Sequence, residues 1–169
     1  MDGVSKMNPS YVVIDNALPD DQHKLILQRF TSDINDRSLL PIWRDYSQVS
    51  ILHQLIDIAS KYFDLSSMVG FEFWSQNQSK PDDWHIDKDE MMCKETGDIS
   101  TPLCTIAYYP IVELTSGGRF ISRDIAIEPR TNRLLIFDST LEHMVENYEG
   151  RRVSILIAPW DRRVKDLEI

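Results

Sequence analysis

A histidine and an aspartate two positions apart are the first residues of this chain whose types and spacing suit chemistry. Residues 84–87 read Trp-His-Ile-Asp, and strand residues i and i+2 project from one face, so His85 and Asp87 can reach one metal ion. A third donor must come from a neighbouring strand, and His143 follows a run of expected strands. Two histidines and one carboxylate leave other metal positions open, the facial arrangement typical of non-heme iron(II) sites. The spacing therefore predicts an iron centre.

A second pair of residues, Arg152 and Ser154, strengthens this prediction, because a His-x-Asp pair alone often arises by chance. The open metal positions suit a 2-oxo acid that chelates the ion, and the far carboxylate of such a cosubstrate needs a cation. Arginine offers a bidentate fork, and a hydroxyl two residues along the same strand face adds a donor. Arg151 is the alternative cation, but strand alternation pairs Arg152 with Ser154.

Two helices and a series of short strands must position these side chains. Ile26, Phe30 and Ile34 recur every four positions after a helix start near Pro19, and a second apolar stripe of helical period covers residues 52–63. Beyond residue 67, short apolar runs separated by turn residues predict strands. The expected strands are 69–74, 84–87, 103–109, 119–121, 125–127, 134–137 and 153–158, with a further one at 11–15. These elements predict a mainly β protein with flanking helices, a sandwich or barrel with helices on one sheet face.

Composition sets the broader class. A chain of 169 residues predicts a single domain, with helical support at 16–66 and a β core at about 67–160. The net charge of −9, from 27 acidic and 18 basic residues, disfavours nucleic acid as a partner. No apolar stretch reaches the roughly 20 residues needed to cross a bilayer, and the first residues lack the apolar core of a signal peptide. With only two cysteines, the expected location is cytoplasmic.

The motifs, in their order and spacing, resemble the prolyl-4-hydroxylase-like branch of the 2-oxoglutarate/Fe(II)-dependent dioxygenase superfamily over nearly the whole chain. The matching segments are Tyr-Val-Val-Ile-Asp-Asn-Ala-Leu at 11–18, Trp-His-Ile-Asp-Lys-Asp at 84–89, Thr-Ile-Ala-Tyr-Tyr at 105–109, Gly-Gly-Arg-Phe at 117–120, Asn-Arg-Leu-Leu-Ile-Phe at 132–137, His143, and Arg-Val-Ser at 152–154. No single segment is specific, but their combination is.

The resemblance implies a double-stranded β-helix, the cupin-like jelly roll, with iron inside its open end. It implies hydroxylation of a substrate C–H bond coupled to conversion of 2-oxoglutarate and O₂ to succinate and CO₂, with ascorbate in support. His85, Asp87 and His143 match the iron ligands, and Arg152 matches the partner of the 2-oxoglutarate carboxylate. Tyr108 falls where a tyrosine often reaches that carboxylate, although the choice between Tyr108 and Tyr109 stays open.

The substrate is less defined. The segment after His143 lacks the Pro-Val step often seen in prolyl hydroxylases, and Arg152 replaces the lysine of the collagen-type enzymes, so activity on proline is disfavoured. A protein side chain or a small molecule is expected. Loops at 75–82 and 88–102 are expected to shape the substrate pocket, with Trp74, Trp84 and Asp89 as candidate contacts and Asp89 on a solvated rim. Oxidative demethylation of nucleic acid and a non-catalytic jelly-roll binding protein are the alternatives, and the oligomeric state is left open.

Overall fold

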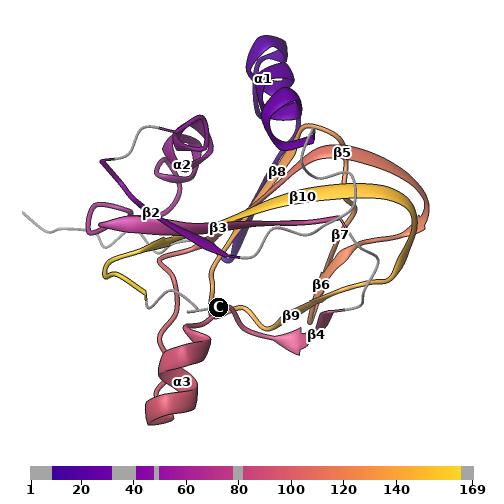
Figure 1. Ribbon diagram of the computed structural model, residues 1–169. Coiled ribbons are helices and arrows are strands. Elements are labelled where there is room, and N and C mark those ends of the chain that lie inside the picture. Colours follow the sequence, from indigo (N-terminus) through magenta and orange to yellow (C-terminus); the bar gives the residue numbers. More distant parts are fainter. Residues whose placement is uncertain (1–8, 32–40, 48–49, 78–81, 165–169) are drawn as a thin grey trace, which may run out of the picture.

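Two antiparallel β-sheets form the framework of the computed structural model, which describes residues 9–31, 41–47, 50–77 and 82–164 (Figure 1). In spatial order, the strands of the larger sheet are β1 (Tyr11–Ile14), β8 (Arg133–Phe137), β5 (Thr105–Gly117), β10 (Tyr148–Trp160), β3 (Gly70–Gln76) and β2 (Ile42–Asp45). Those of the smaller sheet are β4 (Asp82–His85), β9 (His143–Val145), β6 (Phe120–Ser122) and β7 (Ile125–Ile127). This is the mainly β architecture that the strand pattern predicts and the jelly roll that the family resemblance implies.

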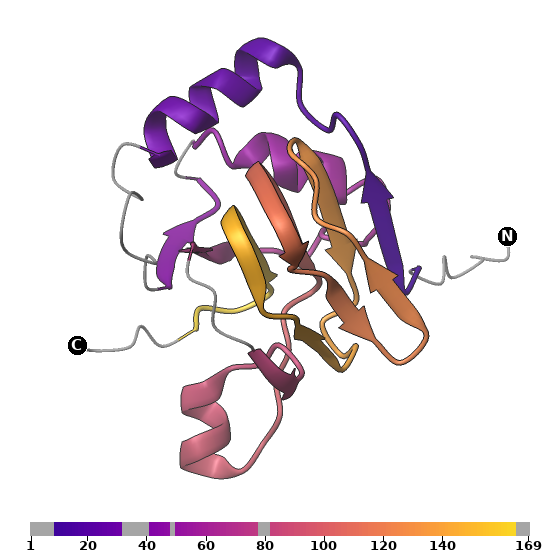
Figure 2. The ribbon, with the colours of Figure 1, turned by 90° about the vertical axis from the view of Figure 1, so that its right-hand side faces the viewer.

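Three helices accompany the sheets: α1 (Asp20–Thr31), α2 (His53–Ala59) and α3 (Glu90–Thr96). Helices α1 and α2 lie together on one side of the large sheet, whereas α3 lies on the other side, as Figures 1 and 2 show. Helix α1 begins directly after Pro19 and has Asp20 and Asp21 in its first turn, where carboxylates favour the positive helix end. None of the described helices is long and apolar enough to cross a membrane.

The alternation of side chains along β5 builds two separate cores. Ile106 and Tyr108 project to the helical side, where they belong to the cluster that includes Ile26 of α1. Ala107 and Tyr109 project to the opposite side and join a second cluster with residues of the small sheet. The large sheet is therefore covered on both faces, and the space between the sheets lies beside the predicted metal ligands.

The structure corrects the predicted boundaries. The helical segment 16–66 also contains β2, and the predicted β core of 67–160 omits β1 and β2, which form the two edges of the large sheet. The segment 88–102, expected to be a loop, contains α3, which ends at Gly97 with φ +78°, a conformation that favours glycine. Residues 78–81 of the other expected loop, and Ile34 of the first helix stripe, lie outside the described residues.

Candidate metal centre

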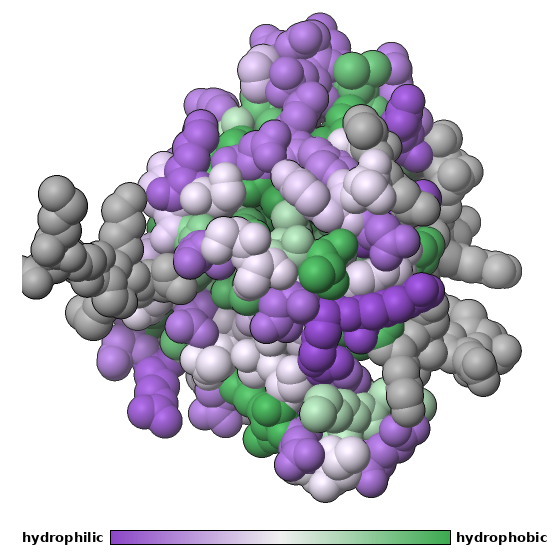
Figure 3. Space-filling view, turned by 90° about the vertical axis from the view of Figure 1, so that its left-hand side faces the viewer, coloured by the Kyte–Doolittle hydropathy of each residue, from purple (hydrophilic) through white to green (hydrophobic). Residues whose placement is uncertain are grey.

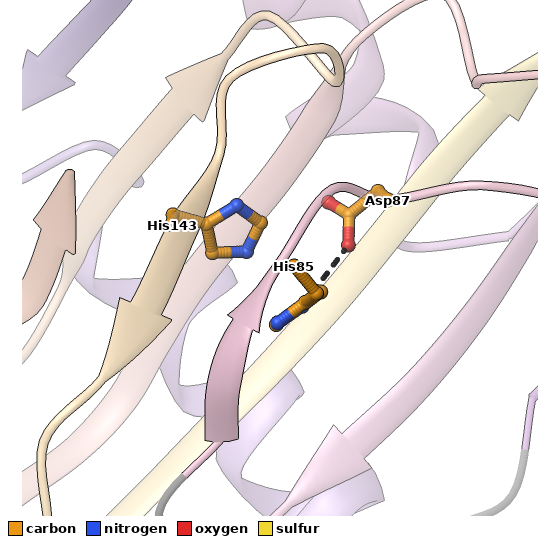
Figure 4. Close-up of side chains that lie close together, drawn as sticks. All are labelled: His85, Asp87 and His143. Carbon is orange, nitrogen blue, oxygen red and sulfur yellow. Dashed lines mark ion pairs between the residues drawn. The ribbon is translucent and has the colours of Figure 1, made fainter. Parts of the chain in front are cut away.

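The three predicted ligands converge at the open end of the small sheet. His85 ends β4, His143 begins β9, and the two residues face each other in the antiparallel register. Asp87 follows on the segment that leaves β4, and Figure 4 shows its carboxylate directed toward His85. The three donor atoms lie within 4.8 Å of one another, and His85 Nε2 is 3.7 Å from Asp87 Oδ1. Two strand ends and the segment after β4 thus bring together residues far apart in the sequence.

Backbone carbonyls orient both imidazoles. His85 Nδ1 donates to the carbonyl of Asp83 at 2.7 Å, and His143 Nδ1 donates to the carbonyl of Leu141 at 2.9 Å. A carbonyl can only accept, so each Nδ1 carries the proton and each Nε2 is the nitrogen that can bind a metal. Such partners fix the tautomer and the ring orientation of metal-binding histidines.

A hydroxyl that the sequence does not single out holds the carboxylate ligand. Thr105 Oγ1 donates to Asp87 Oδ2 at 2.6 Å and lies 3.0 Å from Ser139 Oγ. Thr105 and Ser139 are both buried. No motif reveals this contact, because Thr105 begins a strand remote from Asp87 and meets it only through the fold.

Aromatic rings enclose the His143 side of the site. The His143 ring stacks on Phe120 at 4.9 Å between centroids and meets Phe137 edge to face at the same distance. His143 is buried, whereas the side chain of His85 is 37% exposed. The candidate centre is therefore packed on the His143 side and open on the His85 side.

A buried arginine lies in the same cavity as the three ligands. This pocket has a volume of about 140 Å³, and its lining includes His85, Asp87, His143, Arg152 and Ser154. We call it the inner pocket.

Arg152 is 5% exposed, and its Nε has no hydrogen-bond partner among the described residues. Its guanidinium lies over the rings of Tyr109 and Tyr148, at 5.3 and 5.4 Å from their centroids. No carboxylate of the described residues forms an ion pair with it. A buried arginine with an unsatisfied donor and no anionic partner is costly unless a ligand supplies the anion.

The structure places the two arginine candidates differently. Arg151 is exposed, while Arg152 and Ser154 both line the inner pocket, in line with the predicted strand alternation. Ser154 Oγ makes a long contact of 3.4 Å to the carbonyl of Gln76.

The prediction for Tyr108 is wrong about the direction of its side chain. Its hydroxyl donates to Asn132 Oδ1 at 2.9 Å and lies 2.6 Å from His23 Nδ1, inside the core under α1. Tyr109 instead lines the inner pocket beside Arg152. Burial raises the pKa of Tyr109, although Arg152 opposes the shift, so the phenol stays protonated near neutral pH. Neighbouring strand residues point to opposite faces, and sequence alone does not reveal which face is buried beneath the helices.

The three candidate substrate residues differ in their burial and in whether they line the inner pocket. Trp74 lies on β3, partly buried, and lines the inner pocket. Trp84 is 49% exposed and does not line the inner pocket. Asp89 is not on a solvated rim as predicted: it is 4% exposed, caps α3 by accepting from the Met92 amide at 2.9 Å, and accepts from Arg162 at 3.0 Å.

Comparison with solved structures supports the assignment of the fold. No family model and no curated protein matches the sequence. A Pseudomonas putida prolyl-4-hydroxylase matches with a TM-score of 0.64 and 18% identity, over 91% of this chain and 94% of that one. The collagen prolyl hydroxylase of Paramecium bursaria Chlorella virus-1, in its 2OG complex, matches with a TM-score of 0.62 and 14% identity, over 89% and 96% of the two chains.

A third match is a Trichoplax adhaerens prolyl hydroxylase in complex with a peptide fragment of the hypoxia inducible factor oxygen degradation domain. It has a TM-score of 0.60 and 13% identity, over 95% of this chain and 87% of that one. The chain therefore has the fold of the prolyl hydroxylases among the 2-oxoglutarate/Fe(II) oxygenases.

Proposed function

We propose that this protein is a 2-oxoglutarate- and Fe(II)-dependent oxygenase that hydroxylates a C–H bond of a protein side chain or a small molecule. The observation that carries the proposal is the inner pocket, where the His85, Asp87 and His143 donors and the buried Arg152 line one cavity. A structural metal site would need the three donors but not a buried arginine with an unsatisfied Nε.

The donor set fits iron(II). Two imidazole nitrogens and one carboxylate oxygen are the ligands of the facial sites that bind this metal and leave positions open for other ligands. The three donor atoms lie within 4.8 Å of one another, so they are close enough to bind a single ion. His85, Asp87 and His143 would hold the ion.

The far side of the inner pocket fits the free carboxylate of 2-oxoglutarate. Arg152 would supply the cation, and Ser154 and Tyr109, which also line the pocket, would add hydroxyl donors. A carboxylate seated on Arg152 would satisfy the Nε that has no partner among the described residues. The viral collagen prolyl hydroxylase, which has a similar fold and was solved in its 2OG complex, supports this cosubstrate.

The chain's own residues orient the reactants and exclude water. Bound iron would supply the oxidative chemistry with O₂, in which 2-oxoglutarate becomes succinate and CO₂. The Phe120 and Phe137 rings shield His143 on one side, whereas the opening beside His85 lets the substrate approach. The peptide complex of the Trichoplax adhaerens structure supports a protein substrate.

The test is cosubstrate turnover by the purified protein. With Fe(II), 2-oxoglutarate, O₂ and ascorbate, we expect succinate to form slowly even without prime substrate, and His143→Ala to abolish both iron binding and succinate formation. Lys94→Ala serves as the control, because Lys94 is exposed and does not line the inner pocket. A wild-type protein that binds iron and 2-oxoglutarate but forms no succinate would point to a binding protein, and failure to bind either ligand would refute the proposal.

A further inference from the structure

Asn132, in the turn before β8, contacts two consecutive residues of β5, one of which lines the inner pocket. Its backbone N–H donates to the Tyr109 carbonyl at 2.8 Å, and its Oδ1 accepts from the Tyr108 hydroxyl at 2.9 Å. Asn132 is 8% exposed and does not line the inner pocket itself. Resting on the proposed function, we propose that Asn132 is a positioning residue, which sets the direction of the Tyr109 side chain toward the carboxylate of 2-oxoglutarate.

Tyr109 lies where the pairing of β5 with β10 is irregular. The register shifts between Val153 and Ile155, so that two residues of β5, Tyr109 and Pro110, lie opposite the single residue Ser154. Pro110 has no N–H to donate to the neighbouring strand. A bulge of this kind changes the direction of a side chain and interrupts the hydrogen bonds that would otherwise fix it. The direction of Tyr109 therefore depends on contacts on the other side of β5.

The turn before β8 supplies these contacts. Tyr109 opposes Arg133, the first residue of β8, and is the last residue of β5 in this register. Asn132 comes directly before Arg133. Because Tyr108 and Tyr109 project to opposite faces, bonds to the hydroxyl of one and the carbonyl of the other restrict rotation of the strand about its axis. The orientation of the Tyr109 side chain is thereby restricted as well.

Asn132 is held in turn by the segment that leads into α1. Its side chain accepts from the Leu18 amide at 3.1 Å and donates to the Leu18 carbonyl at 2.8 Å, and its own carbonyl accepts from the Ala17 amide at 3.0 Å. Its φ is +60°, and among the described non-glycine residues only Asn16 also has a positive φ. Asparagine tolerates this conformation better than most residues. It thus provides both the backbone turn and the side-chain bonds, whereas glycine would provide only the turn.

The proposed iron ligands are positioned by other elements. His85 and His143 belong to β4 and β9 of the small sheet, and Asp87 is held by Thr105. Hydrogen bonds weaken steeply when their angle or distance departs from the optimum. A misdirected Tyr109 hydroxyl should therefore lower the affinity for 2-oxoglutarate and leave the affinity for iron nearly unchanged.

Helix α1 offers a control that separates positioning from stability. Its outer surface, at the top of the view in Figure 3, carries many hydrophilic side chains, whereas Ile26 is fully buried beneath the helix. Ile26→Ala leaves a cavity there and should destabilise the docked helix. It removes none of the hydrogen bonds of Asn132, so the affinity for 2-oxoglutarate should stay close to that of the wild type.

A double-mutant cycle tests the proposal. Asn132→Gly, Tyr109→Phe and the double variant are loaded with Fe(II) and titrated anaerobically with 2-oxoglutarate by calorimetry. Glycine keeps the backbone conformation but loses the side-chain bonds. We expect Asn132→Gly to weaken 2-oxoglutarate at least about 5-fold and iron(II) less than about 2-fold. In the Tyr109→Phe background, the same substitution should weaken 2-oxoglutarate less than about 2-fold, because the hydroxyl that Asn132 positions is gone.

A second measurement needs neither iron nor 2-oxoglutarate. With fluorotyrosine incorporated, the fluorine NMR signal of Tyr109 is assigned by its absence in Tyr109→Phe. We expect this signal to shift or broaden in Asn132→Gly and to keep its wild-type position in Asn16→Gly, which changes the other asparagine of positive φ at an exposed site. A wild-type protein that binds no 2-oxoglutarate would overturn the proposed function, and the positioning role with it, while the fluorine signal would still show whether Asn132 orients Tyr109.

Tyr108→Phe removes only one bond to Asn132, and the hydroxyl that it deletes lies in the core under α1. This variant should weaken 2-oxoglutarate about 2- to 3-fold, which keeps the test informative if Asn132→Gly does not fold. Three results would overturn the proposal. They are an equal loss of 2-oxoglutarate affinity with and without the Tyr109 hydroxyl, an equal loss in Ile26→Ala, and a Tyr109 fluorine signal that neither the Asn132 nor the Tyr108 variant changes.

Discussion

At the scale of single residues, the inner pocket depends on groups that are costly to bury without a ligand. Arg152 is enclosed by two tyrosine rings and keeps an unsatisfied Nε, while the neighbouring Arg151 is exposed. This contrast between adjacent arginines provides a matched pair for testing which one binds the cosubstrate.

We expect Arg152→Met to weaken 2-oxoglutarate binding by roughly 100-fold, about 2.7 kcal/mol, because a buried charge-assisted pair is lost. Arg151→Met should have little effect, since this side chain lies in solvent. Calorimetric titration of 2-oxoglutarate into the iron-loaded proteins measures both. If Arg151→Met causes the larger loss, the cosubstrate role passes to Arg151.

The second residue-scale prediction concerns the hydroxyl that holds the carboxylate ligand. Thr105→Val keeps the shape of the side chain but removes the 2.6 Å hydrogen bond to Asp87 Oδ2. Loss of such an outer partner typically lowers metal affinity 10- to 100-fold, so a decrease of about that size is expected in a competition titration with a chelator. Thr115→Val, on the exposed part of the same strand, is the control, and equal iron affinity in both variants would contradict the role of Thr105.

At the scale of elements, helix α1 docks on β5 through a polar contact inside an apolar interface. His23 of α1 meets the Tyr108 hydroxyl at 2.6 Å, and Tyr108 in turn donates to Asn132. Asn132 also binds the backbone of Leu18 through both its side-chain oxygen and nitrogen. These contacts link the start of α1 to the turn before β8.

This junction predicts a pH dependence of stability. Burial lowers the pKa of His23 below the ordinary value of 6.5, while Asp20 opposes the shift. The unfolded chain therefore binds the proton more readily, so the stability from neutral His23 is present above pH 6.5 and is lost as the pH falls through that value toward the lower folded pKa.

His23→Gln removes the titrating group and keeps a hydrogen-bonding side chain. We expect the difference in unfolding free energy, wild type minus variant, to be constant above about pH 7.5 and to decrease below about pH 6.5. Urea unfolding across this range measures it. A difference that grows as the pH falls would mean that the fold stabilises the protonated imidazole instead.

At the scale of the whole molecule, the proposed metal ligands come from the small sheet and its margin, whereas Arg152 and Ser154 come from the large sheet. A metal ion and a cosubstrate bound between them would join the two sheets. Ligands that bind only the folded state stabilise it according to their concentration relative to Kd.

Iron(II) with 2-oxoglutarate should therefore raise the melting temperature measured anaerobically. At about 100 times Kd the gain is roughly 2.7 kcal/mol, which corresponds to an increase of about 5–10 °C for a chain of this size. A chelator should reverse the shift, and His85→Ala should lack it. An equal shift in His85→Ala would show that the ligands bind elsewhere.

The sequence by itself determined the secondary-structure elements and the candidate site residues of this protein to a large extent. Apolar periodicity revealed α1, α2 and most strands of the jelly roll, because the spacing of apolar residues along the chain reflects which face of a helix or strand is buried. Spacing also identified His85, Asp87, His143 and Arg152, and the structure brings these four into one cavity.

Only the tertiary structure decided which faces and partners these residues have. It placed Tyr109 rather than Tyr108 in the inner pocket, because the packing of α1 fixes which side of β5 lies beneath the helices. It also showed that Asp89, expected on a solvated rim, is the N-cap of α3. It further showed that Thr105 donates a hydrogen bond to Asp87. Such contacts join residues distant in the chain, and their free energy depends on burial that no local pattern of residues records.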